Sequence, residues 1–238
     1  MLVIVQAIVL AGGFGTRLRA RVSDVPKPMA PIAGRPFLEY LLDRLLAAGC
    51  TRVVLATGYL HDVIEQHFGA AYRGMAVAYS QETTPLGTGG AVLKALHSLP
   101  DEPTLVMNGD TWLNLDLAAF VAWARARAPA DAVLLRRVDD ISRYGSVVLG
   151  GDGERIVRFG EKAGSGPGLI NAGIYSLRRE ALDRYPFPAT FSLENDHFQP
   201  HVAELDLRGS VTEAPFIDIG VPEDYDRAQI DIPRWLAA

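Results

Sequence analysis

The sequence contains one cysteine, Cys50, among its 238 residues. An internal disulfide is therefore impossible, and a reducing compartment such as the cytoplasm is expected. Cys50 stands between Gly49, which is expected to end a helix, and a strand that begins near Arg52. We predict a buried and chemically inert thiol at this position.

The chain also lacks an excess or a cluster of basic residues. Lys and Arg number 23 against 28 Asp and Glu, and the net charge of −5 argues against a nucleic-acid-binding surface. Residues 1–11 are apolar, but the run is too short to cross a bilayer and no basic residue precedes it. It is predicted to be a strand, and no membrane partner is expected.

Composition is ordinary for a soluble globule, with 49% hydrophobic and 21% charged residues. The length suits one large α/β domain or a domain with a small subdomain. Neither internal repeats nor low-complexity segments are apparent.

The most informative stretch is the glycine-rich run at residues 10–19, Leu-Ala-Gly-Gly-Phe-Gly-Thr-Arg-Leu-Arg, which follows a Val- and Ile-rich run at 2–9. The run at 2–9 is typical of a buried parallel strand. Gly12, Gly13 and Gly15 have no β-carbon, so their backbone N–H groups can close around an anion. Arg17 adds a planar set of donors that suits phosphate oxygens. This pattern predicts a polyphosphate-binding turn, with an ordinary strand-to-helix connection as the alternative.

A dinucleotide-binding turn is excluded by spacing. That fingerprint needs Gly-x-Gly-x-x-Gly followed at once by a helix. Here the spacing differs, and Pro26, Pro28 and Pro31 follow where the helix would run. Residues 23–36 are instead predicted to be extended and stiff, with Lys27 either a solvated loop residue or a rigidly presented cation.

Apolar spacing along the rest of the chain predicts alternating strands and helices in the first part and a hairpin within 144–159. A second glycine-rich turn at 81–90 suggests that both turns line one crevice at the carboxyl ends of the strands. The predicted helices are 36–48, 61–68, 91–96 and 115–128, and the predicted strands are 52–57, 75–79, 104–107, 132–138 and 170–177.

Two acidic residues are candidate metal ligands. Asp110 follows a predicted strand and Gly109, where a carboxylate can hold Mg²⁺ or simply form a turn. Asp218 stands between Ile217 and Ile219, which indicates either a second ligand or a costly burial. The histidines have the wrong spacing for a metal site, because Pro200 interrupts the pair at 197 and 201.

Taken together, the motifs resemble those of the sugar-1-phosphate nucleotidyltransferase family over nearly the whole chain. The resemblance rests on Gly-Gly-Phe-Gly-Thr-Arg-Leu at 12–18, Pro-Lys-Pro-Met at 26–29, Leu-Gly-Thr-Gly-Gly-Ala at 86–91, Asn-Gly-Asp at 108–110, Glu-Lys at 161–162, Asn-Ala-Gly-Ile-Tyr at 171–175 and Asp-Ile-Gly at 218–220. Within the family, the short length and Phe-Ser-Leu-Glu at 191–194 are most similar to heptose 1-phosphate guanylyltransferases, followed by mannose-1-phosphate guanylyltransferases.

The resemblance implies a three-layer, Rossmann-like α/β fold with a mixed, mainly parallel sheet. One domain would span 1–238, with a nucleotide-binding half at 1–138 and an antiparallel, sugar-phosphate-binding half at 139–238. The implied reaction is in-line attack of a sugar 1-phosphate on the α-phosphate of a nucleoside triphosphate, assisted by Mg²⁺. Homo-oligomerisation stays open.

The resemblance also implies a role for each matching residue. Arg17 would neutralise pyrophosphate, Lys27 would bridge the two substrates, Lys162 would hold the acceptor phosphate, and Asp110 with Asp218 would hold Mg²⁺. The implied nucleotide-binding residues are Leu10, Ala11, Gly12, Gly13, Gly15, Thr16, Glu82, Gly87, Thr88, Asn108 and Gly109. The implied sugar-phosphate-binding residues are Gly145, Glu161, Lys162, Asn171 and Glu194.

The resemblance places Glu82 where the family recognises the base. A carboxylate there can accept hydrogen bonds from N1–H and the exocyclic amine of guanine, which favours GTP. A mannose 1-phosphate or uridine-nucleotide enzyme is the alternative, and a non-catalytic nucleotide-sugar sensor is a remote one. Such a sensor would be expected to lack Lys27, Arg17 or a metal ligand, all of which are present.

Overall fold

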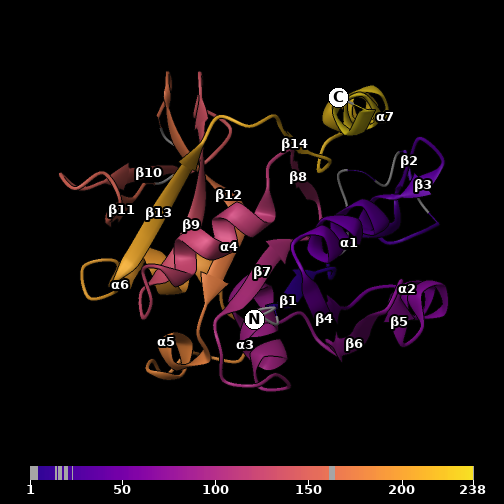
Figure 1. The fold of residues 1–238 in the computed structure, drawn as a ribbon, viewed down its shortest axis with the longest axis horizontal. Helices are drawn as coiled ribbons and strands as arrows, with labels where there is room; N and C mark the ends of the chain where they lie inside the picture. The colour runs from indigo at the N-terminus through magenta and orange to yellow at the C-terminus, as the bar shows by residue number, and fades with distance from the viewer. Residues whose placement is uncertain are drawn as a thin grey trace.

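The computed structural model of the chain describes residues 5–13, 15, 18, 21–22, 24–160 and 164–237. Helices and strands alternate through most of its length (Figure 1). In chain order they are β1 (Val5–Leu10), the 3₁₀ helix η1 (Lys27–Met29), β2 (Pro31–Ile32), β3 (Arg35–Pro36), α1 (Phe37–Ala47), β4 (Cys50–Thr57), α2 (His61–Phe68), β5 (Ala71–Tyr72), β6 (Met75–Gln81), α3 (Gly87–Leu96), β7 (Thr104–Asn108), β8 (Thr111–Leu113), α4 (Leu117–Arg125), β9 (Asp131–Val138), β10 (Ser146–Leu149), β11 (Ile156–Phe159), β12 (Gly168–Leu177), α5 (Arg179–Asp183), the π-helix η2 (Leu193–Phe198), α6 (Gln199–His201), β13 (Leu207–Thr212), β14 (Phe216–Asp218) and α7 (Pro222–Ala237).

A ten-stranded mixed sheet runs through the molecule in the order β11-β10-β12-β7-β1-β4-β6-β5, with β9 on β12 and β13 on β9. Its central strands β7, β1, β4 and β6 are parallel. The long strand β12 pairs antiparallel with β7 and β9, and β10 and β11 form the predicted hairpin. The expected mixed α/β sheet is confirmed.

Helices cover both faces of this sheet, which makes three layers (Figure 1). The side chains of β1 alternate between the two faces, as the period of a strand requires. Ala7 and Val9 pack with buried residues of α1, α4 and α7, whereas Ile8 packs with those of α3, α5 and η2. The apolar run in β1 is therefore buried on both sides, as predicted for a central parallel strand.

Three predicted elements differ in detail. The segment at 23–36 is not extended throughout, because η1 forms a short 3₁₀ turn with Pro28 inside its first turn, where a missing N–H costs little. Helix α3 begins at Gly87 and so includes the glycines that were expected to precede it. Helix α4 is shorter than predicted, since the Asp116 side chain accepts a hydrogen bond from the backbone N–H of Ala118 and caps it there.

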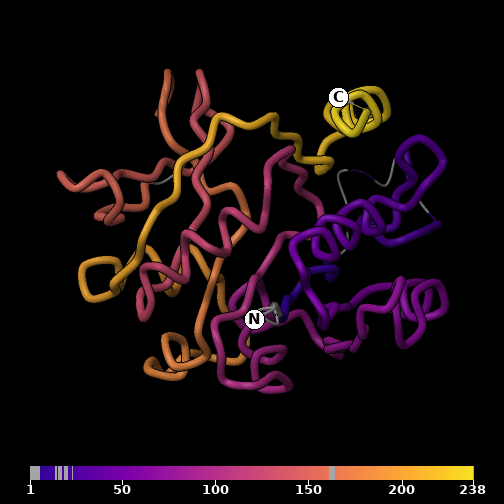
Figure 2. Tube along the Cα trace, in the orientation of Figure 1, coloured from indigo at the N-terminus to yellow at the C-terminus, as the bar shows by residue number. Residues whose placement is uncertain are grey.

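Helix α7 lies against the β2–β3 hairpin, so late and early parts of the chain meet (Figure 2). The hydroxyl of Tyr225 and the side-chain amide of Gln229 donate to the carbonyl of Pro31, at 2.7 and 2.9 Å. These bonds hold the segment that follows Lys27 next to the segment that follows Asp218.

Cys50 is 3% exposed, and burial raises the pKa of its thiol to about 11. The prediction of an inert, buried thiol is confirmed. Among the residues described, none belongs to a helix with the length and apolar character needed to span a bilayer.

Candidate active site

The carboxyl ends of β1, β4, β6 and β7 meet at one edge of the sheet. Parallel pairing aligns Leu10 with Ala56 on one side and with Asn108 on the other, and aligns Thr57 with Gln81. The turns that follow these strands therefore lie together, where ligands bind in open α/β sheets.

The turn after β1 leaves the sheet through Ala11, whose N–H donates to the carbonyl of Ala56 at 2.8 Å. Gly13 and Gly15 have φ of +98° and +55°, which favour glycine. A β-carbon on Gly15 would lie 3.1 Å from Cβ of Lys27, so the turn contacts the segment that presents this lysine. Thr16 and Arg17 lie outside the described residues.

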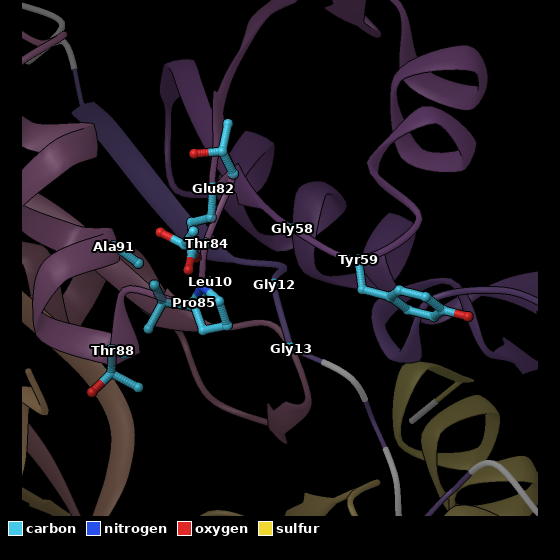
Figure 3. Close-up of a pocket in the computed structure, with 12 residues that line it drawn as sticks. Leu10, Gly12, Gly13, Gly58, Tyr59, Glu82, Thr84, Pro85, Thr88 and Ala91 are labelled. Carbon is cyan, nitrogen blue, oxygen red and sulfur yellow. The ribbon is translucent and has the colours of Figure 1, made fainter. Parts of the chain in front are cut away.

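A cavity of about 440 Å³ opens beside this turn. It is lined by Leu10, Gly12, Gly13, Gly58, Tyr59, Glu82, Thr83, Thr84, Pro85, Gly87, Thr88 and Ala91. Figure 3 shows Thr88 and Ala91 of α3 at one side of the cavity and Tyr59 at the other. Six of the residues expected to bind the nucleotide are thus brought together: Leu10, Gly12, Gly13, Glu82, Gly87 and Thr88.

Glu82 holds its own loop as well as lining this cavity. Its Oε2 accepts a hydrogen bond from the backbone N–H of Leu86 at 2.8 Å. Its Oε1 would lie 3.0 Å from a β-carbon on Gly12, so glycine is needed for the close approach of the two segments. The carboxylate is therefore fixed between the turn after β1 and the start of α3.

The second glycine-rich turn packs against the segment around Phe191. A β-carbon on Gly87, whose φ is +70°, would lie 2.5 Å from the carbonyl oxygen of Phe191, and one on Gly89 would lie 2.2 Å from its ring. Thr88 Oγ1 accepts a hydrogen bond from the N–H of Leu193 at 2.9 Å. These contacts join the nucleotide-side cavity to η2.

Lys27 brings the two candidate metal ligands together. Its Nζ lies 2.5 Å from Oδ2 of Asp110 and 3.6 Å from Oδ1 of Asp218. The side chain of Lys27 is 12% exposed, and those of Asp110 and Asp218 are 37% and 32% exposed. The sequence separates the two carboxylates by more than a hundred positions, yet both contact one ammonium group.

Strand pairing explains this convergence. The short strands β8 and β14 are antiparallel, with Asp218 opposite Thr111, and the N–H of Ile219 donates to the carbonyl of Asp110 at 3.0 Å. The N–H of Gly220 donates to Oδ1 of Asp218 at 2.7 Å, which orients that carboxylate. Asp218 is half-buried and ion-paired, so its position in an apolar strand is not a burial error.

This donor set fits Mg²⁺. A hard cation of this size is usually held by one or two carboxylates together with substrate phosphates. Within the described ranges, no group of three or more His, Cys, Asp or Glu residues is arranged to hold a metal ion. Asp110 and Asp218 could hold the ion, with phosphate oxygens completing its shell.

Asn108, Gly109 and Gly173 connect this acidic site to β12. A β-carbon on Gly109 would lie 2.3 Å from the carbonyl oxygen of Leu10, and one on Gly173 would lie 2.4 Å from Nδ2 of Asn108. Gly173 also has a φ of +72°. Both positions therefore need glycine, because a β-carbon would not fit. Gly109 lets the segment before Asp110 pack closely against the end of β1.

A second cavity, of about 350 Å³, lies between the hairpin, β12 and η2. It is lined by Gly145, Ser146, Phe159, Gly160, Asn171, Glu194, Asn195 and Gln199. Gly145, Asn171 and Glu194 were expected to bind the sugar phosphate, and they share this cavity. Glu161 and Lys162, expected at the same site, lie outside the described residues.

Asn171 holds Glu194 within this cavity. Its Nδ2 donates to Tyr175 Oη at 2.8 Å and to Oε1 of Glu194, and its Oδ1 accepts from the N–H of Gly173 at 2.9 Å. Burial raises the pKa of Tyr175, so its phenol stays protonated. Both amide hydrogens of Asn171 are engaged, so this side chain positions its neighbours more than it offers donors to a ligand.

Several lining residues were missed by the sequence analysis, among them Tyr59, Thr84, Ser146, Asn195 and Gln199. Tyr59 follows the carboxyl end of β4, so the argument used for Asp110 could have found it. Gln199 reaches its cavity through π-helical winding, for which the sequence offers no periodic signal.

The nucleotidyl transferase family model matches residues 6–234 of the chain. The chain belongs to the nucleotidyl transferase family. A D-glycero-α-D-manno-heptose 1-phosphate guanylyltransferase of Aneurinibacillus thermoaerophilus is 38% identical to this transferase over 232 residues, which are 97% of this chain and 100% of the relative. The mannose-1-phosphate guanylyltransferase of Mycobacterium tuberculosis is also 38% identical, over 98% of this chain and 66% of the relative.

Solved structures agree with this assignment. The crystal structure of HddC from Yersinia pseudotuberculosis matches this transferase with a TM-score of 0.83 and 35% identity, over 96% of this chain and 100% of that one. A second structure of HddC, in complex with GMP-PN, matches with a TM-score of 0.81. The predicted family and fold are confirmed.

Proposed function

We propose that the protein transfers a guanylyl group from GTP to D-glycero-α-D-manno-heptose 1-phosphate, giving GDP-heptose and pyrophosphate. The principal support is the convergence of Lys27, Asp110 and Asp218 at the carboxyl edge of the sheet. The turn that follows β1 and the strand β12 both come close to this point. The cavity that contains Glu82 adjoins that turn, and the cavity that contains Glu194 adjoins β12.

The chemistry requires no protein nucleophile. The second pKa of a phosphate monoester is about 6, so the acceptor is largely dianionic at neutral pH and needs no general base. Its oxygen attacks the α-phosphorus in line while the bond to pyrophosphate breaks. Catalysis then consists of positioning the substrates and neutralising their charge.

Lys27 would contact both the triphosphate and the acceptor phosphate, since it lies beside Gly15 and between the acidic residues. Mg²⁺, held by Asp110 and Asp218, would neutralise charge on the α-phosphate. Arg17 would stabilise the departing pyrophosphate and Lys162 the acceptor phosphate. We assign these two roles from the family's motifs.

The base and the sugar are the finer parts of the proposal. Glu82 supports guanine, because a fixed carboxylate can accept from both N1–H and the exocyclic amine of that base. The full-length similarity to heptose 1-phosphate guanylyltransferases supports the heptose. Mannose 1-phosphate is the second candidate, because a mannose-1-phosphate guanylyltransferase has the same identity to this chain. The reducing compartment indicated by Cys50 supports a cytoplasmic reaction.

A substrate matrix tests the proposal directly. Pyrophosphate release is measured with GTP, ATP, UTP and CTP, each combined with heptose 1-phosphate, mannose 1-phosphate and glucose 1-phosphate, in the presence of Mg²⁺. We expect the highest kcat/KM for GTP with heptose 1-phosphate. A higher value for UTP would reject the base assignment, and a higher value for mannose 1-phosphate would favour the second candidate. Nucleotide binding without turnover would support a sensor.

A further inference from the structure

We infer that Gln199 is a specificity-determining residue, which binds the hydroxyl groups of the side chain beyond the sugar ring together with Glu194. The inference rests on the proposed function and names the part of the acceptor that the second cavity distinguishes. Heptose differs from mannose by one additional hydroxymethylene unit in that side chain, so a polar residue at this point would separate the two acceptors.

The winding of η2 places Gln199 beside Glu194. In a π-helix the backbone bonds join residues five apart, and the N–H of Gln199 donates to the carbonyl of Glu194 in this way. In an α-helix the neighbours of Glu194 along the same face would be His197 and Phe198. Here those two side chains are buried at 0% exposure, while Glu194 and Gln199 line the cavity.

Pro200 accounts for this unusual winding. A proline inside an α-helix has no N–H to donate, and its ring collides with the carbonyl four residues earlier. The wider π turn before Pro200 relieves that collision. Ser192 caps the start of the turn, because its Oγ accepts from the N–H of Asn195 at 3.1 Å. Single π turns often occur at functional sites.

The order of contacts shows which end of the acceptor reaches Gln199. Asp110 is two residues from Asn108, Asn108 contacts Gly173, and Asn171 lies two residues farther along β12. Asn171 in turn bonds to Glu194, beside which Gln199 lies. A sugar with its 1-phosphate toward Asp110 and Lys27 therefore has its most distant carbons toward Glu194 and Gln199.

The amide of Gln199 is suited to this task. The residue is half-buried, and among the residues that the structure describes none hydrogen bonds with its side-chain amide. An amide both donates and accepts, whereas Glu194 only accepts when ionised. The pair can therefore bind two neighbouring hydroxyl groups, one through each side chain. A site built to hydrogen bond a hydroxyl group discriminates against an analogue that lacks it.

The test compares two acceptors in the full-length enzyme. Initial rates are measured at saturating GTP and Mg²⁺ with varied heptose 1-phosphate or mannose 1-phosphate, for the wild type, Gln199→Leu and Gln199→Ala. Loss of one hydrogen bond should lower kcat/KM for heptose 1-phosphate by about tenfold, with a much smaller effect on mannose 1-phosphate and none on the KM for GTP. Gln66→Leu, at an exposed position of α2, is the matched control.

Three outcomes are distinguishable. A changed ratio of the two kcat/KM values in both Gln199 variants, but not in Gln66→Leu, supports the inference. An equal loss for both acceptors, or no loss, overturns it while the proposed reaction stands. A wild type that uses neither acceptor with GTP rejects the proposed function, and the inference with it. Two variants of different size keep the test valid if one of them does not fold.

Discussion

Lys27 donates a hydrogen bond of 2.5 Å from Nζ to Oδ2 of Asp110, across 83 positions of sequence. The ammonium also lies 3.6 Å from Oδ1 of Asp218. The positively charged group of Lys27 thus lies where the two carboxylates meet. Charge balance at this point is the property on which the proposed reaction most depends, because both substrates bring additional negative charge.

Asp110→Asn should reduce kcat by at least about 100-fold, a loss typical of removing one group that stabilises transition-state charge. The substitution removes a charge but little volume, so the free energy of unfolding should change little. Turnover and thermal unfolding are measured side by side. Asp62→Asn, at an exposed carboxylate on α2, is the control. Wild-type turnover in Asp110→Asn would remove this residue from the mechanism.

Glu82→Gln should selectively impair GTP. The glutamine can still accept the hydrogen bond from Leu86, so the loop should keep its position. The glutamine lacks the negative charge and one of the two acceptor oxygens that guanine would use. We therefore expect kcat/KM for GTP to fall by about 10- to 100-fold, as for the loss of a hydrogen bond to a charged group. The measurement is kcat/KM for GTP and UTP with the same acceptor. Equal losses for both nucleotides would exclude base recognition by Glu82.

Much of this site is predictable because parallel strands align their carboxyl ends. That rule alone predicts that the turns after Leu10 and Gln81 and the carboxylate of Asp110 lie near one another, and they do. The convergence of Asp218 depends on the antiparallel pair β8 and β14, which the sequence analysis did not identify. The position of Asp218 between Ile217 and Ile219 left a metal ligand and a costly burial as alternatives, and the family resemblance favoured the ligand.

Other features depend on contacts between side chains that no local pattern predicts. The glycines at 87 and 89 were expected only to form a turn that lines the crevice, but β-carbons at these positions would also collide with Phe191, about a hundred positions away. Asn171 is predicted to bind the sugar, and its amide hydrogens also bond to Tyr175 and Glu194, which its sequence position does not predict. Such roles follow from tertiary packing, which overrides the local signal.

Gly89→Ala should destabilise the fold through contact with Phe191. The new methyl group would lie 2.2 Å from the Phe191 ring, which itself stacks on Phe187 at 4.2 Å. Overpacking of this kind costs about 1–3 kcal/mol, which exceeds or offsets the gain of about 1 kcal/mol from replacing glycine in a helix.

A double-mutant cycle separates these two effects. In a Phe191→Ala background the collision is absent, so Gly89→Ala should become neutral or stabilising. Urea denaturation of the two single variants, the double variant and the wild type gives the coupling free energy. Additive effects would mean that the methyl group and the ring do not meet.

The stability of the protein should depend on the protonation of His197. Its ring is 0% exposed, it packs near Tyr185, Phe187 and His201, and within the described residues neither ring nitrogen has a hydrogen-bond partner. Burial, together with a smaller effect of the nearby His201, lowers the pKa of His197 from 6.5 to about 4. Between these two values the unfolded chain binds a proton that the folded chain does not, so stability falls as pH falls.

Comparison with His197→Phe isolates this contribution. The lowered pKa of His197 should cost the wild type roughly 2 kcal/mol of its free energy of unfolding between pH 7 and pH 5. The variant lacks this histidine and should not show this loss. Asp131 acts in the opposite direction, because burial raises its pKa to about 7 and stability is gained as pH falls. Since Asp131 is common to both proteins, its effect cancels in the difference between their urea-unfolding curves. Identical pH dependence in the two proteins would show that His197 titrates normally, or finds a partner, in the folded chain.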